Sequence, residues 1–117
     1  MGLSTHVLDT MHGCPAAGMA VALFAMEGEL ARPLRQFVLN ADGRCPDGLL
    51  IDGASLKPGL YRLVFDVAAY FRARQVALPE PSFLNWVTLD FGIAHANEHY
   101  HVPLLVSPWS YSTYRGS

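Results

Sequence analysis

The last nineteen residues of the chain read His99-Tyr100-His101-Val102-Pro103-Leu104-Leu105-Val106-Ser107-Pro108-Trp109-Ser110-Tyr111-Ser112-Thr113-Tyr114-Arg115-Gly116-Ser117. The alternation in residues 100–106 predicts a β-strand. One face of this strand would carry Tyr100, Val102, Leu104 and Val106 toward a core, and the other His99, His101, Pro103, Leu105 and Ser107. The second face is too apolar for free solvent and too polar for a core. We therefore interpret it as a site that another subunit covers.

The composition predicts one globular domain, residues 1–117, that forms an oligomer. Hydrophobic residues make up 51% of the chain and charged residues only 15%, which leaves less charge than usual to cover the outside of a small monomer. The length is sufficient for a core without metal or disulfide support. A formal net charge of −2 gives no electrostatic reason to expect nucleic acid or an anionic membrane as a partner.

The cysteines and the N-terminal residues favour a cytoplasmic protein. Cys14 and Cys45 are the only cysteines, and they show neither metal-ligand spacing nor a disulfide-rich pattern. The apolar run 14–26 is interrupted by Pro15 and Gly18 and is too short to span a bilayer. Residues 1–9 lack the basic residues of a signal peptide.

The remaining pattern predicts short strands and one helix. Strands are expected at 3–9, 19–26, 32–39, 49–51, 60–66 and 86–93, followed by two closing strands, with residues 12–15 as a turn. The helix is expected from Val67 to Gln75, with Asp66 as its N-cap. Asp42-Gly43 is a strong turn signal, so Arg44 leaves the tip of a loop. Together these elements predict an all-β antiparallel sandwich with one short helix.

Several residues could carry chemistry, although the chain contains no familiar catalytic signature. His6 is either a strand histidine bonded to a neighbouring backbone group or a general acid or base. Arg44 is either a solvated loop residue or a forked donor for a planar anion or an oxyanion. The His99/His101 pair could be a surface pair or a metal site, but no third ligand stands at a suggestive spacing and we expect no metal.

These residues, taken in order, resemble a known family. The segments that carry the resemblance are Leu3-Ser4-Thr5-His6-Val7-Leu8-Asp9, Gly13-Cys14-Pro15-Ala16, Asp42-Gly43-Arg44, His99-Tyr100-His101-Val102-Pro103-Leu104-Leu105 and Tyr111-Ser112-Thr113-Tyr114-Arg115-Gly116-Ser117. They look like those of the 5-hydroxyisourate hydrolases, also called transthyretin-related proteins. The terminal Tyr-Arg-Gly-Ser is the most specific part, since it separates these hydrolases from the carrier transthyretin. One departure is Ala94-His95-Ala96-Asn97, where relatives are expected to carry an acidic residue and often a proline.

The resemblance implies a transthyretin-like sandwich of two four-stranded sheets, assembled as a homotetramer (a dimer of dimers) with active sites in a channel between dimers. It implies hydrolysis of 5-hydroxyisourate to 2-oxo-4-hydroxy-4-carboxy-5-ureidoimidazoline in urate breakdown, without cofactor or metal. The functional positions carried over are His6, Arg44, His101 and Ser117, with Tyr114, Arg115 and Gly116 completing a substrate-binding tail and His99 in support.

On this basis, His6 and His101 are expected to meet across the channel and to position or deprotonate a water that attacks the C6 carbonyl. Arg44 would orient the ring, and the hydroxyl or terminal carboxylate of Ser117 would bind substrate or water. The alternatives are a transthyretin-like carrier that binds a small aromatic ligand in the same channel, and a structural sandwich with no ligand.

Overall fold

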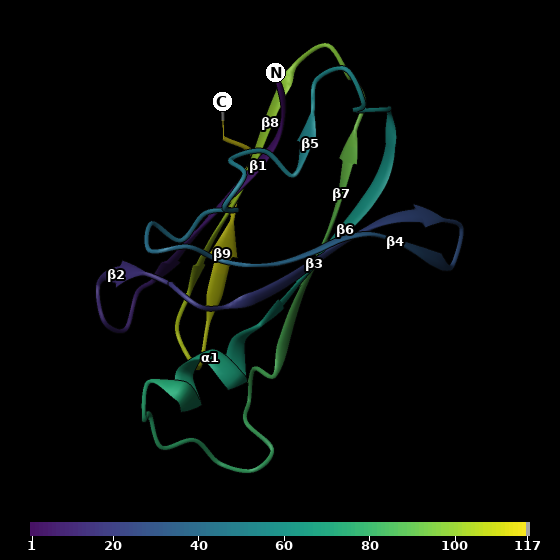
Figure 1. The fold of residues 1–117 in the computed structure, drawn as a ribbon. Helices are drawn as coiled ribbons and strands as arrows, with labels where there is room; N and C mark the ends of the chain where they lie inside the picture. The colour runs from purple at the N-terminus through teal and green to yellow at the C-terminus, as the bar shows by residue number, and fades with distance from the viewer. Residues whose placement is uncertain (117) are drawn as a thin grey trace.

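The computed structural model describes residues 1–116, which form two β-sheets and one short helix (Figure 1). The strands are β1 (Gly2–Asp9), β2 (Cys14–Pro15), β3 (Ala20–Glu27), β4 (Leu30–Val38), β5 (Ile51–Asp52), β6 (Gly59–Asp66), β7 (Trp86–Ile93), β8 (His99–Val106) and β9 (Tyr111–Thr113). One sheet has the order β2-β1-β8-β9, with β5 also paired to β1, and the other has the order β4-β3-β6-β7. The predicted all-β sandwich with one short helix is therefore confirmed, with two short strands bringing the first sheet to five.

The sequence pattern predicted an antiparallel sandwich, but the first sheet contains one parallel pair of strands. β1 and β8 run parallel along their whole length, from Gly2 opposite His99 to Asp9 opposite Val106. Because the two strands lie almost a chain length apart in sequence, no local turn signal reveals their relative direction. The pairing places the starts of β1 and β8 at the same end of the molecule, far from α1 (Figure 1).

The core lies between the sheets, and the predicted inward face of β8 is confirmed. Tyr100, Val102, Leu104 and Val106 are all at most 7% exposed. They pack with buried side chains of both sheets and the helix, among them Leu3, Val7, Leu23, Leu63, Phe65 and Phe71. Burial of apolar surface of this kind is the main driving force of folding.

The helix is shorter than predicted. α1 spans Val67–Ala73, and Gln75 already has a φ of 65°. Asp66 occupies the N-cap position but its side chain makes no capping hydrogen bond. The amides of Val67 and Ala68 instead donate to the carbonyl of Asn85, at 3.1 and 3.0 Å. A segment distant in sequence thus accepts hydrogen bonds from the amides at the start of the helix. Within residues 1–116 there is no helix with the length and hydrophobicity needed to cross a bilayer.

Strand boundaries also differ from the prediction, most clearly at β4 and β2. β4 begins at Leu30, ahead of the predicted residue 32, because its hairpin with β3 pairs as far as Glu27 opposite Leu30. Pro33 is tolerated inside it because β4 is an edge strand and the register shifts between Leu23 and Phe24. Cys14 and Pro15, expected in a turn, form the short strand β2 against the end of β1.

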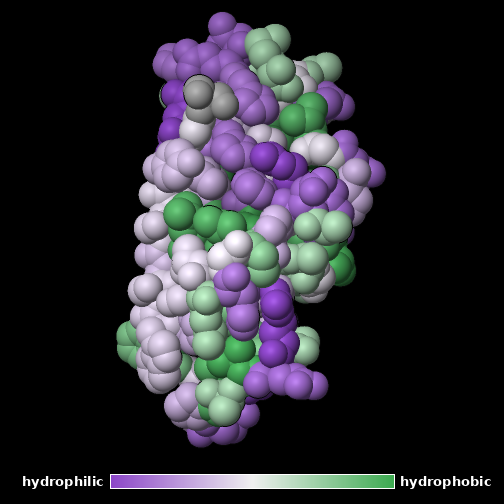
Figure 2. All heavy atoms as spheres, turned by 90° about the vertical axis from the view of Figure 1, so that its left-hand side faces the viewer, coloured by the Kyte–Doolittle hydropathy of each residue, from purple (hydrophilic) through white to green (hydrophobic). Residues whose placement is uncertain are grey.

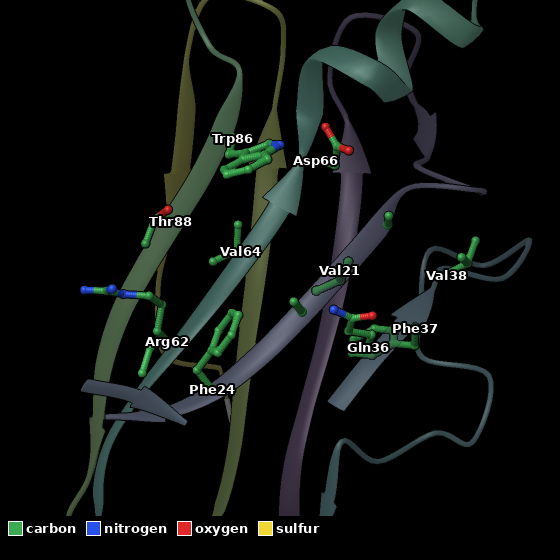
Figure 3. Close-up of a pocket in the computed structure, with 13 residues that line it drawn as sticks. Val21, Phe24, Gln36, Phe37, Val38, Arg62, Val64, Asp66, Trp86 and Thr88 are labelled. Carbon is green, nitrogen blue, oxygen red and sulfur yellow. The ribbon is translucent and has the colours of Figure 1, made fainter. Parts of the chain in front are cut away.

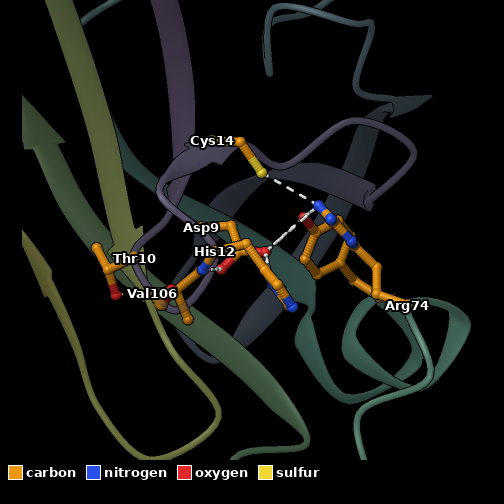
Figure 4. Close-up of polar contacts among 7 residues, drawn as sticks. Asp9, Thr10, His12, Cys14, Arg74 and Val106 are labelled. Atoms are coloured by element: carbon orange, nitrogen blue, oxygen red, sulfur yellow. Dashed lines mark hydrogen bonds and ion pairs between the residues drawn. The ribbon is translucent and has the colours of Figure 1, made fainter.

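A buried carboxylate ties the helix to the end of β1 (Figure 4). Asp9 is fully buried and accepts hydrogen bonds from the His12 amide at 2.9 Å and the Tyr70 hydroxyl at 2.8 Å. His12 Nδ1 lies 2.6 Å from the same carboxylate. Arg74 completes the cluster by donating to the Tyr70 hydroxyl and to Cys14 Sγ, both at 3.1 Å. Residues from β1, the following turn, β2 and α1 are thus joined through one acid.

The hydrogen bonds to Asp9 lower its pKa by more than burial raises it. Burial alone would raise its pKa, but the donors from the His12 amide, Tyr70 and the His12 ring bring the pKa below the usual value. The same arrangement raises the pKa of Tyr70 to about 12, mainly through burial and then through the bond to Asp9. Asp9 is therefore charged, and its phenol partner neutral, at physiological pH.

We predict that Asp9→Asn lowers the free energy of unfolding at pH 7 by about 3 kcal/mol, since it removes the charged acceptor of a buried network. Because the folded-state pKa of Asp9 lies below its unfolded value, this stabilisation is fully present above pH of about 4 and is lost as the pH falls through the folded-state pKa. Urea unfolding at several pH values measures both effects.

Asp90→Asn is the matched control, because the Arg62–Asp90 ion pair is exposed. It should cost no more than about 1 kcal/mol. An equal loss in the two variants would contradict the structural role of Asp9.

Candidate active site

The pairing of β1 with β8 places polar side chains from the two ends of the chain on one sheet face. Ser4 lies opposite His101, Gly2 opposite His99 and His6 opposite Pro103. Residues opposite one another in a parallel pair project to the same side, and alternate residues along each strand share that side. His6, His99 and His101 therefore project from the face that points away from the core, and all three are half-buried.

Ser4 links the two β8 histidines. Its hydroxyl oxygen lies 2.8 Å from His101 Nδ1 and 3.1 Å from His99 Nε2. The serine is only 8% exposed, so both contacts form where water has little access. No function was expected for Ser4 from the sequence. Alternation along residues 3–9 was the only sequence signal that could have found it.

A tight loop places Arg44 beside His6. The side chain of Asn40 accepts hydrogen bonds from the amides of Asp42 and Arg44, at 2.9 and 3.0 Å. The Gly43 carbonyl accepts from the Val7 amide at 2.9 Å, which fastens the loop to β1. Arg44 then forms an isolated antiparallel bridge with His6. The predicted turn at Asp42-Gly43 is confirmed, and the arginine that leaves it is exposed.

Gly43 is required for this approach. Its φ is +73°, and an added Cβ would lie 2.6 Å from the Val7 carbonyl oxygen. Only glycine combines this backbone conformation with so close a contact.

The C-terminal segment runs back along β8 to His101. Thr113 of β9 donates to the Pro103 carbonyl at 2.7 Å, and the Gly116 amide donates to the His101 carbonyl at 2.7 Å. A Cβ on Gly116 would lie 2.8 Å from His101 Cδ2 and 3.2 Å from its Cβ. The glycine of the tail motif is thus packed directly against a predicted catalytic ring.

Arg115 is engaged by the loop between β7 and β8. Its guanidinium donates to Glu98 Oε1 at 3.0 Å and to the His99 carbonyl at 3.2 Å. It also lies over the Tyr100 ring, 4.0 Å from the ring centroid. These contacts fix the tail in place, so within this chain Arg115 is a support for the segment that carries Gly116.

The structure thus brings His6, Arg44, His99, His101 and Gly116 to one region. His6 and His101 lie on neighbouring strands of a single chain, and the expectation that they meet across a channel stays a prediction. Tyr114 is 61% exposed beside this region. Ser117 lies outside the described residues, and its predicted contact with substrate or water stays a prediction.

The surroundings of His101 favour its neutral form. Burial is the largest effect and lowers its pKa, and electrostatic repulsion from Arg44 and then from the neighbouring His6 and His99 lowers it further. A neutral imidazole retains a lone pair and can accept a proton near pH 7. The arrangement therefore combines a proton acceptor with a guanidinium that can hold an anion or a developing oxyanion.

The face that carries these residues is open within one chain. Figure 2 views the side of the molecule toward β1, β2 and β9, where a hydrophobic band crosses the middle between hydrophilic groups. Residues 1–116 include no cluster of three or more His, Cys, Asp or Glu side chains that could hold a metal ion.

A hollow of about 720 Å³ lies elsewhere, on the outer face of the β4-β3-β6-β7 sheet (Figure 3). Phe24, Val64 and Trp86 line it, with Arg62 and Asp66 at its polar positions. It contains none of the predicted site residues, so we place the chemistry on the histidine-bearing sheet.

The fold and this face together define a transthyretin-like β-sandwich with a histidine- and arginine-bearing site. Residues 3–116 match the model of the HIUase/Transthyretin family, and the chain belongs to this family. It is 54% identical to the 5-hydroxyisourate hydrolase of Pseudomonas aeruginosa over 115 residues, which are 98% of this chain and 90% of that protein.

Solved structures show the same similarity. The 5-hydroxyisourate hydrolase of Klebsiella pneumoniae matches with a TM-score of 0.81 and 36% identity, and all of each chain is covered. An (S)-allantoin synthase matches with a TM-score of 0.93 and 43% identity. That match includes 99% of this chain but 43% of the larger protein.

We predict that Gly116→Ala displaces either the His101 ring or the tail, because the added methyl group would contact the ring. The NMR signals of the His101 ring should shift, and the amide of residue 116 should lose protection from hydrogen exchange. Gly92→Ala is the control, since a Cβ there would meet only Leu60 Cδ2 at 3.6 Å. Unchanged ring signals and full protection in Gly116→Ala would contradict the packing described.

A second prediction concerns the charge around His101. Its pKa should lie below the ordinary value of about 6.5, and Arg44→Gln should raise it, because one of the positive charges that oppose its protonation is removed. NMR titration of the ring protons measures both values. A His101 pKa that does not move in Arg44→Gln would show that the guanidinium is too distant to act on it.

Proposed function

We propose that this chain hydrolyses 5-hydroxyisourate to 2-oxo-4-hydroxy-4-carboxy-5-ureidoimidazoline, as a step of urate catabolism. The support comes from the family and from the convergence of His6, His101 and Arg44 on one sheet face. Relatives and the Klebsiella structure bear the name of this hydrolase. The single observation that carries the proposal is the strand pairing that brings His6, His101 and Arg44 together on one sheet face, because imidazoles can accept a proton and a guanidinium can stabilise an oxyanion during ring opening.

In the proposed reaction, His101 acts as the base. Water loses a proton to the His101 ring while its oxygen attacks C6 of the substrate. Arg44 orients the planar ring and offsets the negative charge on the tetrahedral oxygen. The bond between C6 and N1 then breaks, and the proton held by His101 passes to the departing nitrogen. His6 lies beside both groups and helps to position the water, and no metal or other cofactor is assigned to any step.

The tail and the quaternary structure complete the proposal. Tyr114, Arg115, Gly116 and Ser117 are proposed to border the substrate, with Arg115 acting through its contacts to Glu98 and His99. We also propose that residues 1–117 form one domain that assembles as a homotetramer, a dimer of dimers, in which a partner subunit covers the open face. The cytoplasm is the proposed compartment, in keeping with the free thiols of Cys14 and Cys45.

A carrier is the second candidate function, because the family also includes transthyretin. A carrier would bind a small aromatic ligand on the same face without turnover. The presence of three imidazoles and a guanidinium there favours the hydrolase, since a binding site for an apolar ligand has no need of several titratable groups.

The deciding assay generates 5-hydroxyisourate from urate with urate oxidase and follows the decay of its absorbance. The protein should accelerate this decay, and His101→Asn should lower kcat by about 10²–10⁴-fold, the usual contribution of an acid–base group. Deleting residues 114–117 in the same assay tests the tail.

His95→Asn is the matched control, because His95 is exposed in the loop before β8. It should leave the rate unchanged. No acceleration by the wild-type protein would favour the carrier, and a near-normal rate in His101→Asn would remove His101 from the mechanism.

A further inference from the structure

Ser4 lies within hydrogen-bond distance of both β8 histidines, His99 and His101. It lies directly opposite His101 in the β1–β8 register, and its oxygen is within hydrogen-bond distance of His101 Nδ1 and His99 Nε2. With 8% exposure it is nearly closed to solvent, so neither contact is readily exchanged for water. A buried serine hydroxyl between two rings restricts how protons can be distributed over them.

A hydroxyl group has one proton and can accept two hydrogen bonds, so Ser4 can donate to only one of the two rings, and two arrangements use that proton between the rings. In the first, His101 Nδ1–H donates to Ser4 and the Ser4 hydroxyl donates to His99 Nε2. In the second, His99 Nε2–H donates to Ser4 and the hydroxyl donates to His101 Nδ1. For a neutral His101 ring, the first arrangement leaves Nε2 with a free lone pair, whereas the second places a proton on Nε2.

The surrounding charge favours the first arrangement. Arg44 and His6 lie near enough to His101 to oppose the gain of a positive charge on its ring. The ring is therefore neutral, and because Nδ1 faces Ser4, Nε2 is the nitrogen left to face water or substrate.

We propose that Ser4 is a positioning residue that holds His101 as its Nδ1–H tautomer by accepting that proton and donating its own to His99. This inference rests on the proposed function for its catalytic consequence. During the reaction, the proton from water binds to Nε2 of His101 and leaves again with the departing nitrogen of the substrate. The protons on Nδ1 and on the Ser4 hydroxyl stay in place, so Ser4 orients the base without exchanging a proton.

The tautomer is measured directly by ¹⁵N NMR of the histidine rings in the full-length protein, independently of any activity. In wild-type protein, Nδ1 of His101 should carry the proton and Nε2 should not. In Ser4→Ala the ring should lose this preference, and kcat should fall by about 10- to 100-fold, as for other residues that orient a functional histidine. KM should change little, because Ser4 acts through His101. Ser4→Thr, which keeps a hydroxyl, should recover most of the rate.

Thr5→Val is the matched control. Thr5 is the next residue of β1, and its hydroxyl donates to the Val102 carbonyl at 2.6 Å on the core side of the sheet. Its loss should lower the unfolding midpoint but leave the His101 tautomer and kcat unchanged.

A proton on Nε2 of His101 in the wild-type protein overturns the proposal, and this result is available even if Ser4→Ala fails to fold. A wild-type kcat in folded Ser4→Ala overturns it as well. If the wild-type protein does not hydrolyse 5-hydroxyisourate, the proposed function fails, while the NMR result still decides whether Ser4 sets the tautomer.

Discussion

The structure depends above all on the parallel hydrogen-bonded register between β1 and β8. This register joins the first strand to a strand near the other end of the chain and places Ser4 opposite His101. A shift by one residue would turn alternate side chains to the opposite face, sending histidines into the core and Leu104 or Val106 outward. The buried side chains of both strands therefore fix the position of the site residues, and the stability of the core and the geometry of the site have the same origin.

The second constraint is the close backbone packing around the two histidine-bearing strands. Gly43 lets the Arg44 loop approach the Val7 carbonyl, and Gly116 lets the tail approach the His101 ring. Both are backbone contacts that a side chain would block, so neither Arg44 nor the tail reaches the site through side-chain flexibility alone. At the opposite end of β1 from the site, the buried Asp9 carboxylate joins that strand to α1. This contact stabilises the part of the fold that is distant from the site.

Local pattern was sufficient to predict the two faces of β8, the turn before Arg44 and the presence of one helix. These features depend on alternation, on Asp42-Gly43 and on an alanine-rich run, which are all properties of neighbouring residues. The parallel direction of β1, the capping of α1 by the Asn85 carbonyl and the bridging position of Ser4 depend on residues distant in sequence. No local pattern determines such contacts, and for this reason the sequence pointed to the histidines but not to the serine between them.

We propose that His6, from the first strand, and His101, from the eighth, act as one catalytic unit. A double-mutant cycle on the rate of 5-hydroxyisourate hydrolysis tests it most directly, with His6→Asn, His101→Asn and the combined variant compared with the wild-type protein. Residues that act as a unit give strongly non-additive losses, so the combined variant should be little slower than the slower single variant. Losses in free energy of activation that simply add would show that the two histidines act independently, and would contradict the account.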